Sequence, residues 1–263
     1  NPKKVMVIGG GVAGLCAAFI AKEKGHEVTL YEAGDVLGGN MRLAAYPPGK
    51  GDITNMIRSY IHRCQKDGVK IVMNCEVTPE LIKEEKPDSV IIATGSKTLI
   101  LPIEGIDNPA IIHGSDLLDG KRPAGKKVLV VGGGMVGCET AAFLGEQEHD
   151  VTVIEFRDTV GADVIHEHRV YLMKDFEDYG IKEITGAKVC KFYEDGVEYE
   201  TADGVRHETR GYDSVILSMG FRNYNPLEEK IKDLVPETHV IGDAIRARRA
   251  LDATKEAYEV ASR

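Results

Sequence analysis

The chain contains the sequence Val5-Met-Val-Ile-Gly9-Gly-Gly11-Val-Ala-Gly14, and the same pattern returns as Val128-Leu-Val-Val-Gly132-Gly-Gly134-Met-Val-Gly137. Each copy joins a short apolar run, typical of a buried strand, to a G-x-G-x-x-G turn and a helical stretch. A second apolar run then ends in an acid, Glu32 in the first copy and Glu155 in the second. Both acids follow the turn at close to the spacing of about 20 residues that dinucleotide-binding folds use. One such fingerprint is weak evidence, but two in the same context predict two dinucleotide-binding sites.

The three glycines of each copy have different physical roles. The first permits a tight turn out of the strand, the second lets the backbone approach a pyrophosphate, and the third allows close packing of helix and sheet. The helix that follows offers unpaired N–H groups and a partial positive charge to the phosphates, and the acid accepts hydrogen bonds from ribose hydroxyls. The alternative is a pair of structural turns with incidental acids. The candidate residues are Gly9, Gly11, Gly14 and Glu32 in the first copy, and Gly132, Gly134, Gly137 and Glu155 in the second.

Length and composition limit the class of protein. The 263 residues suit two compact domains, and the formal net charge of −9 argues against a nucleic-acid partner. No apolar run approaches the roughly 18 residues of a membrane helix, residues 1–30 do not have the pattern of a signal peptide, and no long basic run offers a membrane patch. The five cysteines are scattered without metal-ligand spacing, which favours reduced thiols in a cytoplasmic protein. Because numbering begins at Asn1 without a Met, we expect a fragment or a processed chain.

The duplication extends beyond the fingerprints. Ser89-Val-Ile-Ile-Ala-Thr-Gly95 is a buried strand that runs into a small-residue turn, and Asp213-Ser-Val-Ile-Leu-Ser-Met-Gly220 repeats it in the second half. Between the second fingerprint and this repeat, residues 188–210 alternate in polarity and are broken by two Asp-Gly pairs, which predict a three-stranded antiparallel meander. The apolar run His239-Val-Ile-Gly242-Asp243 suggests that the chain returns to the first domain. We therefore predict an α/β fold of two Rossmann-like three-layer domains, the second inserted in the first, with antiparallel β-meander crossovers.

Three further segments are candidate cofactor contacts. Leu37-Gly38-Gly39-Asn40-Met41-Arg42 carries paired glycines just beyond Glu32, although it could also be a simple flexible loop. The turns at Gly95 and Gly220 end equivalent strands. Asp243 either binds a cofactor or acts as a turn or N-cap residue, and the sequence context favours the first.

With these motifs, the whole chain resembles the two-dinucleotide-binding flavoproteins. Asn1-Pro-Lys-Lys-Val-Met-Val-Ile-Gly9, Leu37-Gly-Gly-Asn-Met-Arg-Leu-Ala44 and Pro47-Pro-Gly-Lys50 are similar to the C-terminal half of the NADH:flavin oxidoreductase family, which includes enoate reductases, 2,4-dienoyl-CoA reductases and trimethylamine dehydrogenase. The resemblance implies an FAD-binding domain at residues 1–118 and 223–263 and an NAD-binding domain at 119–222. The implied FAD contacts are Gly9, Gly11, Gly14, Glu32, Gly38, Gly39, Arg42, Gly95 and Asp243, and the implied NAD contacts are Gly132, Gly134, Gly137, Glu155 and Gly220.

In that family an N-terminal barrel carries FMN, a four-iron–four-sulfur cluster and the substrate site. The sequence contains neither the clustered cysteine ligands nor the repeats of such a barrel. The resemblance therefore implies a truncated chain or an electron-input module whose partner is an FMN/iron–sulfur barrel domain or subunit. The thioredoxin-reductase and glutathione-reductase branches need a redox cysteine pair, which this sequence lacks. No metal ligand is expected in these residues.

The predicted activity is hydride transfer from NADH to FAD, with electrons passed on to a barrel that reduces an enoate-type substrate. The cofactors carry this chemistry, so no catalytic side chain is assigned. Glu155 favours NADH because a carboxylate repels the 2′-phosphate of NADPH, although Arg157 lies two residues later. One alternative is a structural module that binds only ADP, as in trimethylamine-dehydrogenase-like relatives. A third reading is a self-contained NADH:acceptor reductase.

Overall fold

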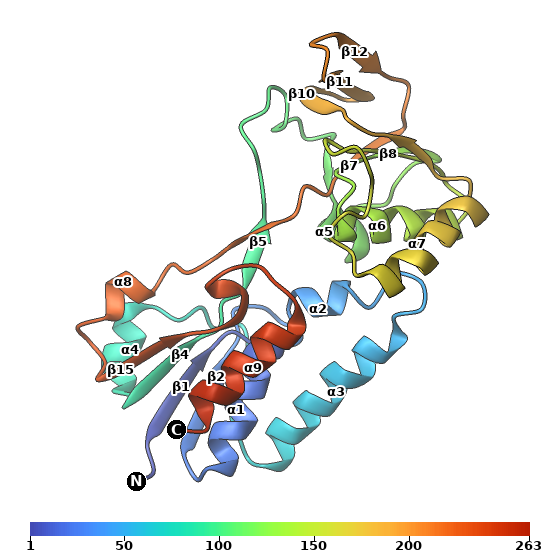
Figure 1. The fold of residues 1–263 in the computed structure, drawn as a ribbon. Coiled ribbons are helices and arrows are strands. Elements are labelled where there is room, and N and C mark those ends of the chain that lie inside the picture. The colour runs from blue at the N-terminus through green and yellow to red at the C-terminus, as the bar shows by residue number, and fades with distance from the viewer. The chain divides into compact units, whose positions relative to one another are not determined.

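The computed structural model describes residues 1–263 (Figure 1). Two parallel five-stranded sheets form the cores of the chain. Each sheet belongs to a separate compact unit. Unit 1 comprises Asn1–Ala45, Gly51–Lys97 and Phe221–Arg263, and unit 2 comprises Tyr46–Lys50 and Thr98–Gly220. Because the segments of unit 1 flank those of unit 2 in the sequence, the prediction that the second unit is inserted in the first is confirmed.

The sheet of unit 1 has the strand order β15-β4-β1-β2-β3, and all of its pairs are parallel. The return of the C-terminal segment to this sheet, predicted from the sequence, is confirmed by the pairing of β15 with β4. The elements are β1 Lys4–Ile8, α1 Val12–Glu23, β2 Glu27–Tyr31, α2 Asn40–Leu43, α3 Gly51–Lys66, β3 Lys70–Val72, α4 Pro79–Glu85, β4 Ser89–Ile92, α8 Glu228–Ile231, β15 Glu237–Val240, the 3₁₀ turn η1 Gly242–Ala244 and α9 Ala250–Ala261.

Alternate residues of these strands face opposite layers of unit 1. Val5 and Val7 of β1 pack with α1, α3 and α9 in one cluster, while Met6 and Ile8 pack with α4 and α8 in another. Strands buried on both faces read as continuous apolar runs, which explains the sequence of β1. Unit 1 is therefore a three-layer α/β domain, with helix α4 rather than a meander between β3 and β4.

The sheet of unit 2 has the equivalent order β6-β13-β7-β8-β9, again entirely parallel. Helices α5, α6 and α7 cover one face. The predicted three-stranded antiparallel meander, β10-β11-β12, packs against the other face through Phe192 and Val197. The elements are β6 Ile112–His113, α5 Gly114–Leu118, β7 Lys127–Val131, α6 Met135–Glu146, β8 Asp150–Ile154, α7 His166–Asp178, β9 Lys182–Ile184, β10 Lys188–Tyr193, β11 Gly196–Glu200, β12 Arg206–Thr209 and β13 Ser214–Leu217.

The domain boundaries differ from those expected. Residues 98–118 were assigned to the first domain, but they belong to unit 2, where β6 is the edge strand beside β13. The chain returns from unit 2 to unit 1 between Gly220 and Phe221, two residues earlier than expected. A strand of two residues has no detectable periodicity, so the sequence could not reveal β6. Two short strands, β5 (Ser96–Thr98) and β14 (Phe221–Asn223), form a separate two-stranded sheet.

None of the helices combines the length and the apolar character needed to cross a bilayer.

Candidate functional site

The first glycine turn has one open position between two tightly packed ones. Gly9 has a φ of +108°, and a Cβ on it would stand 2.3 Å from the carbonyl oxygen of Ala93. A Cβ on Gly14 would stand 1.9 Å from the carbonyl oxygen of Gly9. A Cβ on Gly11, in contrast, would meet nothing within 4 Å. The fold itself requires Gly9 and Gly14, whereas the absence of a side chain at Gly11 keeps space open at the N-terminus of α1.

The second glycine turn repeats this geometry. Gly132 has a φ of +107°, and its Cβ would lie 2.5 Å from the carbonyl oxygen of Ser218. A Cβ on Gly137 would lie 1.8 Å from the carbonyl oxygen of Gly132. The middle glycine, Gly134, is less open than Gly11, because Oδ2 of Asp163 lies 3.3 Å from the Cβ position. The two turns therefore share one backbone design and differ in what faces their middle glycine.

Glu32 extends from the end of β2 to its own glycine turn. Its Oε2 accepts a hydrogen bond from Gly10 N at 2.7 Å, and its Oε1 accepts one from Gly34 N at 2.7 Å. Each carboxylate oxygen can accept a further bond. Backbone donors thus fix the orientation of the carboxylate and leave acceptor capacity for a ligand.

Glu155 occupies the same place at the end of β8. Its Oε2 accepts from Gly133 N at 2.6 Å, and its Oε1 accepts from Arg157 N at 3.0 Å. The twin arrangement fits the ribose end of a dinucleotide in both units, because a ribose presents two hydroxyl donors.

The paired glycines beyond Glu32 lie against the first turn. Gly38 (φ +110°) donates its N–H to the carbonyl oxygen of Gly10 at 2.8 Å. A Cβ on Gly39 would lie 3.2 Å from Cα of Gly11. Arg42 follows in the short helix α2 and donates its backbone N–H to Gly39 at 3.1 Å. These contacts bring the Gly38–Arg42 segment to the open position of the turn.

Gly95 and Asp243 come together at the carboxyl ends of two neighbouring strands. Gly95 lies just beyond β4 with a φ of +74° and open space at its Cβ position. Asp243 follows β15, and its carboxylate accepts hydrogen bonds from Ser96 Oγ at 2.9 Å and Arg248 N at 3.1 Å. Asp243 thus fixes the position of residues 94–97. The nine residues of unit 1 that were expected to contact FAD therefore lie near the carboxyl ends of its strands.

Unit 2 has a cavity of about 600 Å³ over the ends of β7, β8 and β13. Four of the five expected NAD contacts line it, and the fifth, Gly137, lies inside α6. Ligand pockets of this size are common in α/β proteins at the carboxyl edge of the sheet. The lining contacts are Gly132, Gly134, Glu155 and Gly220.

Unit 2 contains a buried cluster of charged side chains that was not predicted from the sequence. The carboxylate of Glu139, in α6, is 6% exposed and forms an ion pair with Lys50 Nζ, whose side chain is 18% exposed. His168 Nε2 of α7 lies 3.3 Å from the same carboxylate oxygen. The presence of Glu139 in the otherwise apolar stretch of α6 indicates a buried charge, but its partners are far away in sequence and could not be identified. The pair ties the Tyr46–Lys50 segment to unit 2.

The cysteines are all free thiols. Burial raises the pKa of Cys16 to about 11 and the pKa values of Cys64 and Cys138 to about 12. These thiols stay protonated at neutral pH and are poor nucleophiles. No group of three or more His, Cys, Asp or Glu residues is arranged to hold a metal ion.

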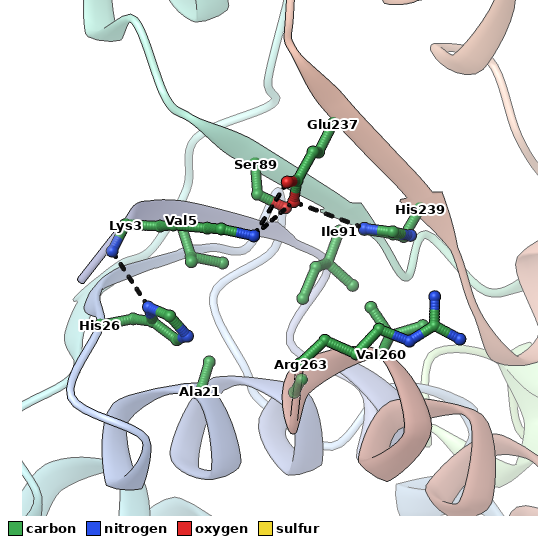
Figure 2. A pocket seen from close by; sticks show the side chains of 11 residues that line it. Lys3, Val5, Ala21, His26, Ser89, Ile91, Glu237, His239, Val260 and Arg263 are labelled. Atoms are coloured by element: carbon green, nitrogen blue, oxygen red, sulfur yellow. Dashed lines mark hydrogen bonds and ion pairs between the residues drawn. The ribbon is translucent and has the colours of Figure 1, made fainter. Parts of the chain in front are cut away.

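Another cavity opens at the opposite edge of the unit 1 sheet (Figure 2). There Lys3 Nζ pairs with Glu237 at 2.9 Å, and His239 Nε2 lies 3.9 Å from Glu237. Burial lowers the pKa of His239, although the adjacent Glu237 opposes the shift. These residues stand at the starts of the parallel strands, whereas the glycine turn stands at their ends. The cavity is therefore separate from the candidate dinucleotide site.

Comparison with known proteins places this geometry in a family. The family pattern of the pyridine nucleotide-disulphide oxidoreductases matches residues 3–242. The chain belongs to that family. Membership implies binding of FAD and NAD(P) and an oxidoreductase function. In this chain all five cysteines are free thiols, so no disulfide is formed.

Three similar proteins are longer than this chain. It is 34% identical to the bilirubin reductase of Mediterraneibacter gnavus over 263 residues, covering 99% of this chain and 40% of that protein. It is 33% identical to the cinnamate reductase of Clostridium sporogenes over 262 residues, covering 98% and 39%. The structure of a 2-naphthoyl-CoA reductase complex matches with a TM-score of 0.94 and 32% identity, covering 100% and 40%. The chain thus spans about two fifths of these relatives, and the resemblance to enoate-reductase-type flavoenzymes is confirmed.

Proposed function

We propose that the chain is the NADH-dependent, FAD-binding oxidoreductase module of an enoate-reductase-type flavoenzyme. The observation that carries the proposal is that each glycine turn orients a carboxylate, Glu32 in unit 1 and Glu155 in unit 2, together with the open Cβ position at Gly11 in the first turn. If the G-x-G-x-x-G turn served only to pack the helix on the sheet, the middle residue would not have to be glycine, because a Cβ at Gly11 would meet nothing. A ligand whose backbone-bound phosphate occupies this space explains it.

The residues of each unit fit one cofactor. In unit 1, Gly11, Gly39 and the α1 N-terminus would face the diphosphate of FAD, Glu32 its ribose, and Asp243 the ribityl or phosphate part. Gly9, Gly14, Gly38, Arg42 and Gly95 would complete that site. In unit 2, the contacts to NADH would be Gly132, Gly134, Gly137, Glu155 and Gly220. When bound, the two cofactors supply hydride transfer, and the side chains position them.

The rest of the enzyme would supply the substrate site. In the relatives named as reductases of bilirubin, cinnamate and 2-naphthoyl-CoA, more than half of the chain lies outside the matched region, since this chain covers 39–40% of each. We propose that the partner is an FMN/iron–sulfur barrel domain or subunit that receives electrons and reduces an unsaturated, enoate-type substrate in the cytoplasm.

The test is the colour of the purified chain and its response to NADH. A yellow protein whose flavin absorbance near 450 nm is bleached by NADH without oxygen is expected. Extraction of ADP and no flavin would instead identify a structural nucleotide-binding module. A flavin that stays oxidised under excess NADH, while dithionite bleaches it, would contradict the proposed NADH donor.

Glu155→Ala should weaken NADH binding by roughly tenfold to a hundredfold, because hydrogen bonds to a charged acceptor contribute about 1.5–3 kcal/mol. The affinity for NADPH should fall less, since the lost carboxylate also repels the 2′-phosphate. Anaerobic titration calorimetry with both nucleotides, on protein whose FAD has been reduced beforehand so that no hydride is transferred, measures the two constants.

Glu32→Ala is the matched control, because Glu32 makes the same contacts in the other unit. It should lower FAD occupancy and leave the NADH constant unchanged. Equal NADH affinity in wild type and Glu155→Ala would show that Glu155 does not bind the ribose.

A further inference from the structure

The N-terminus of α6 already holds a carboxylate. Oδ1 of Asp163 accepts a hydrogen bond at 2.9 Å from the backbone N–H of Met135, the first residue of this 12-residue helix. Its Oδ2 lies 3.3 Å from the Cβ position of Gly134. Asp163 also lines the cavity that contains Glu155. The side chain therefore stands over the middle glycine of the fingerprint, where a dinucleotide places its diphosphate.

The duplicated sequence gives an internal reference for this position. Gly38 in unit 1 and Gly161 in unit 2 each donate a backbone N–H to the carbonyl oxygen of the residue before the middle glycine, at 2.8 and 2.7 Å. Two residues later stand Asn40 in unit 1 and Asp163 in unit 2. The two loops thus return to their turns in the same way, and these residues are structural counterparts.

The counterparts use their side chains differently. Asn40 donates from Nδ2 to the carbonyl oxygen of Ser96 at 3.2 Å and leaves the turn free. No atom lies within 4 Å of the Cβ position of Gly11, so no side chain stands over the first turn as Asp163 stands over Gly134. Asp163 instead bonds the Met135 N–H of α6. Unit 1 therefore presents an unblocked anion site, whereas unit 2 fills its site with its own negative charge.

The loop that carries Asp163 is anchored on both sides. Val160 and Val164 are buried in the core cluster of unit 2, and Arg169 donates to the carbonyl oxygen of Val160 at 3.1 Å. The hydrogen bond of Asp163 itself is exposed. A change of the Asp163 side-chain rotamer can therefore clear the helix N-terminus without moving the loop.

We propose that Asp163 is a built-in competitor for the diphosphate of NADH, an inference that rests on the proposed NADH site in unit 2. The carboxylate takes the same N–H donor and the same positive end of α6 that the diphosphate needs. NADH binds only to the fraction of molecules in which Asp163 has turned away, so its apparent affinity is reduced by that fraction. Asp163 thereby keeps the NADH affinity below what the glycine turn alone would give.

Two substitutions separate charge from hydrogen bonding. Asp163→Asn keeps an acceptor for Met135 N–H but removes the charge, and Asp163→Ala removes both. The dissociation constant for NADH should fall about threefold in the first variant and about tenfold in the second. ADP-ribose should follow the same order. Adenosine, which has no diphosphate, should bind all three proteins equally. Anaerobic calorimetric titration of the chain, with its FAD reduced beforehand so that NADH cannot transfer hydride, measures these constants, and melting curves verify folding.

The outcomes separate this inference from the proposed function. If the wild type binds NADH but neither variant binds it more tightly, the proposed role of Asp163 is wrong. The proposed NADH site is unaffected by that result. A gain that extends to adenosine would also overturn it, because the effect would then not concern the diphosphate. If folded wild type and variants all fail to bind NADH and ADP-ribose, the proposed NADH site itself is wrong.

Discussion

Gly14→Ala should lower the free energy of unfolding by about 3 kcal/mol, at the upper end of the usual effect of overpacking. The new Cβ would stand 1.9 Å from the carbonyl oxygen of Gly9 and 3.4 Å from Cβ of Ala93. Backbone atoms cannot rotate away, so α1 would have to move off β1 and β4. The melting temperature, measured by calorimetry without added nucleotide, should fall by roughly 6–12 °C.

Gly11→Ala is the matched control in the same turn. Its Cβ would meet nothing within 4 Å, and its φ of −73° suits any residue. Because Gly11 is the N-cap of α1, alanine there should cost no more than about 1 kcal/mol. FAD binding should nevertheless be lost, since the methyl group occupies the space proposed for the diphosphate. A Gly14→Ala protein that melts like wild type, or a Gly11→Ala protein that retains FAD, would contradict these assignments.

Lys50→Met should destabilise the protein by about 3 kcal/mol, because it leaves the Glu139 carboxylate buried without its cation. Glu139 is 6% exposed, and after the substitution only the His168 imidazole, whose Nε2 lies 3.3 Å from the carboxylate, remains as a partner. Glu139→Gln should cost less, since Lys50 is 18% exposed and can turn toward water. Denaturant unfolding of both variants measures the difference.

The double variant Lys50→Met with Glu139→Gln tests the coupling between the two charges. It should be more stable than Lys50→Met alone, because a neutral amide is cheaper to bury than a carboxylate. Lys174→Met, which breaks the exposed ion pair with Asp178, should leave the melting temperature unchanged. If Lys50→Met behaved like Lys174→Met, the buried pair would contribute nothing to stability.

The agreement between sequence and structure is best where the signal is local. The strand, glycine turn and helix of each copy lie within one short segment, and their packing is set by residues a few positions apart, as Gly14 and Gly9 illustrate. The meander is equally local, because hairpins join neighbouring residues. The error at residues 98–118 arose where a two-residue strand, Ile112–His113, joined its sheet through pairing with distant Ile216 and Leu217.

The sequence by itself determined two nucleotide-binding folds, one nested in the other, because each depends on a repeated pattern of turns and apolar runs. Only the tertiary structure decided that Glu139 meets Lys50 and His168, and that Asp163 reaches the N-terminus of α6. These contacts join side chains from separate loops and helices, and no periodicity or spacing encodes which of them will meet. The physical reason is that local patterns specify backbone conformation, whereas the pairing of distant charges depends on how the finished elements pack.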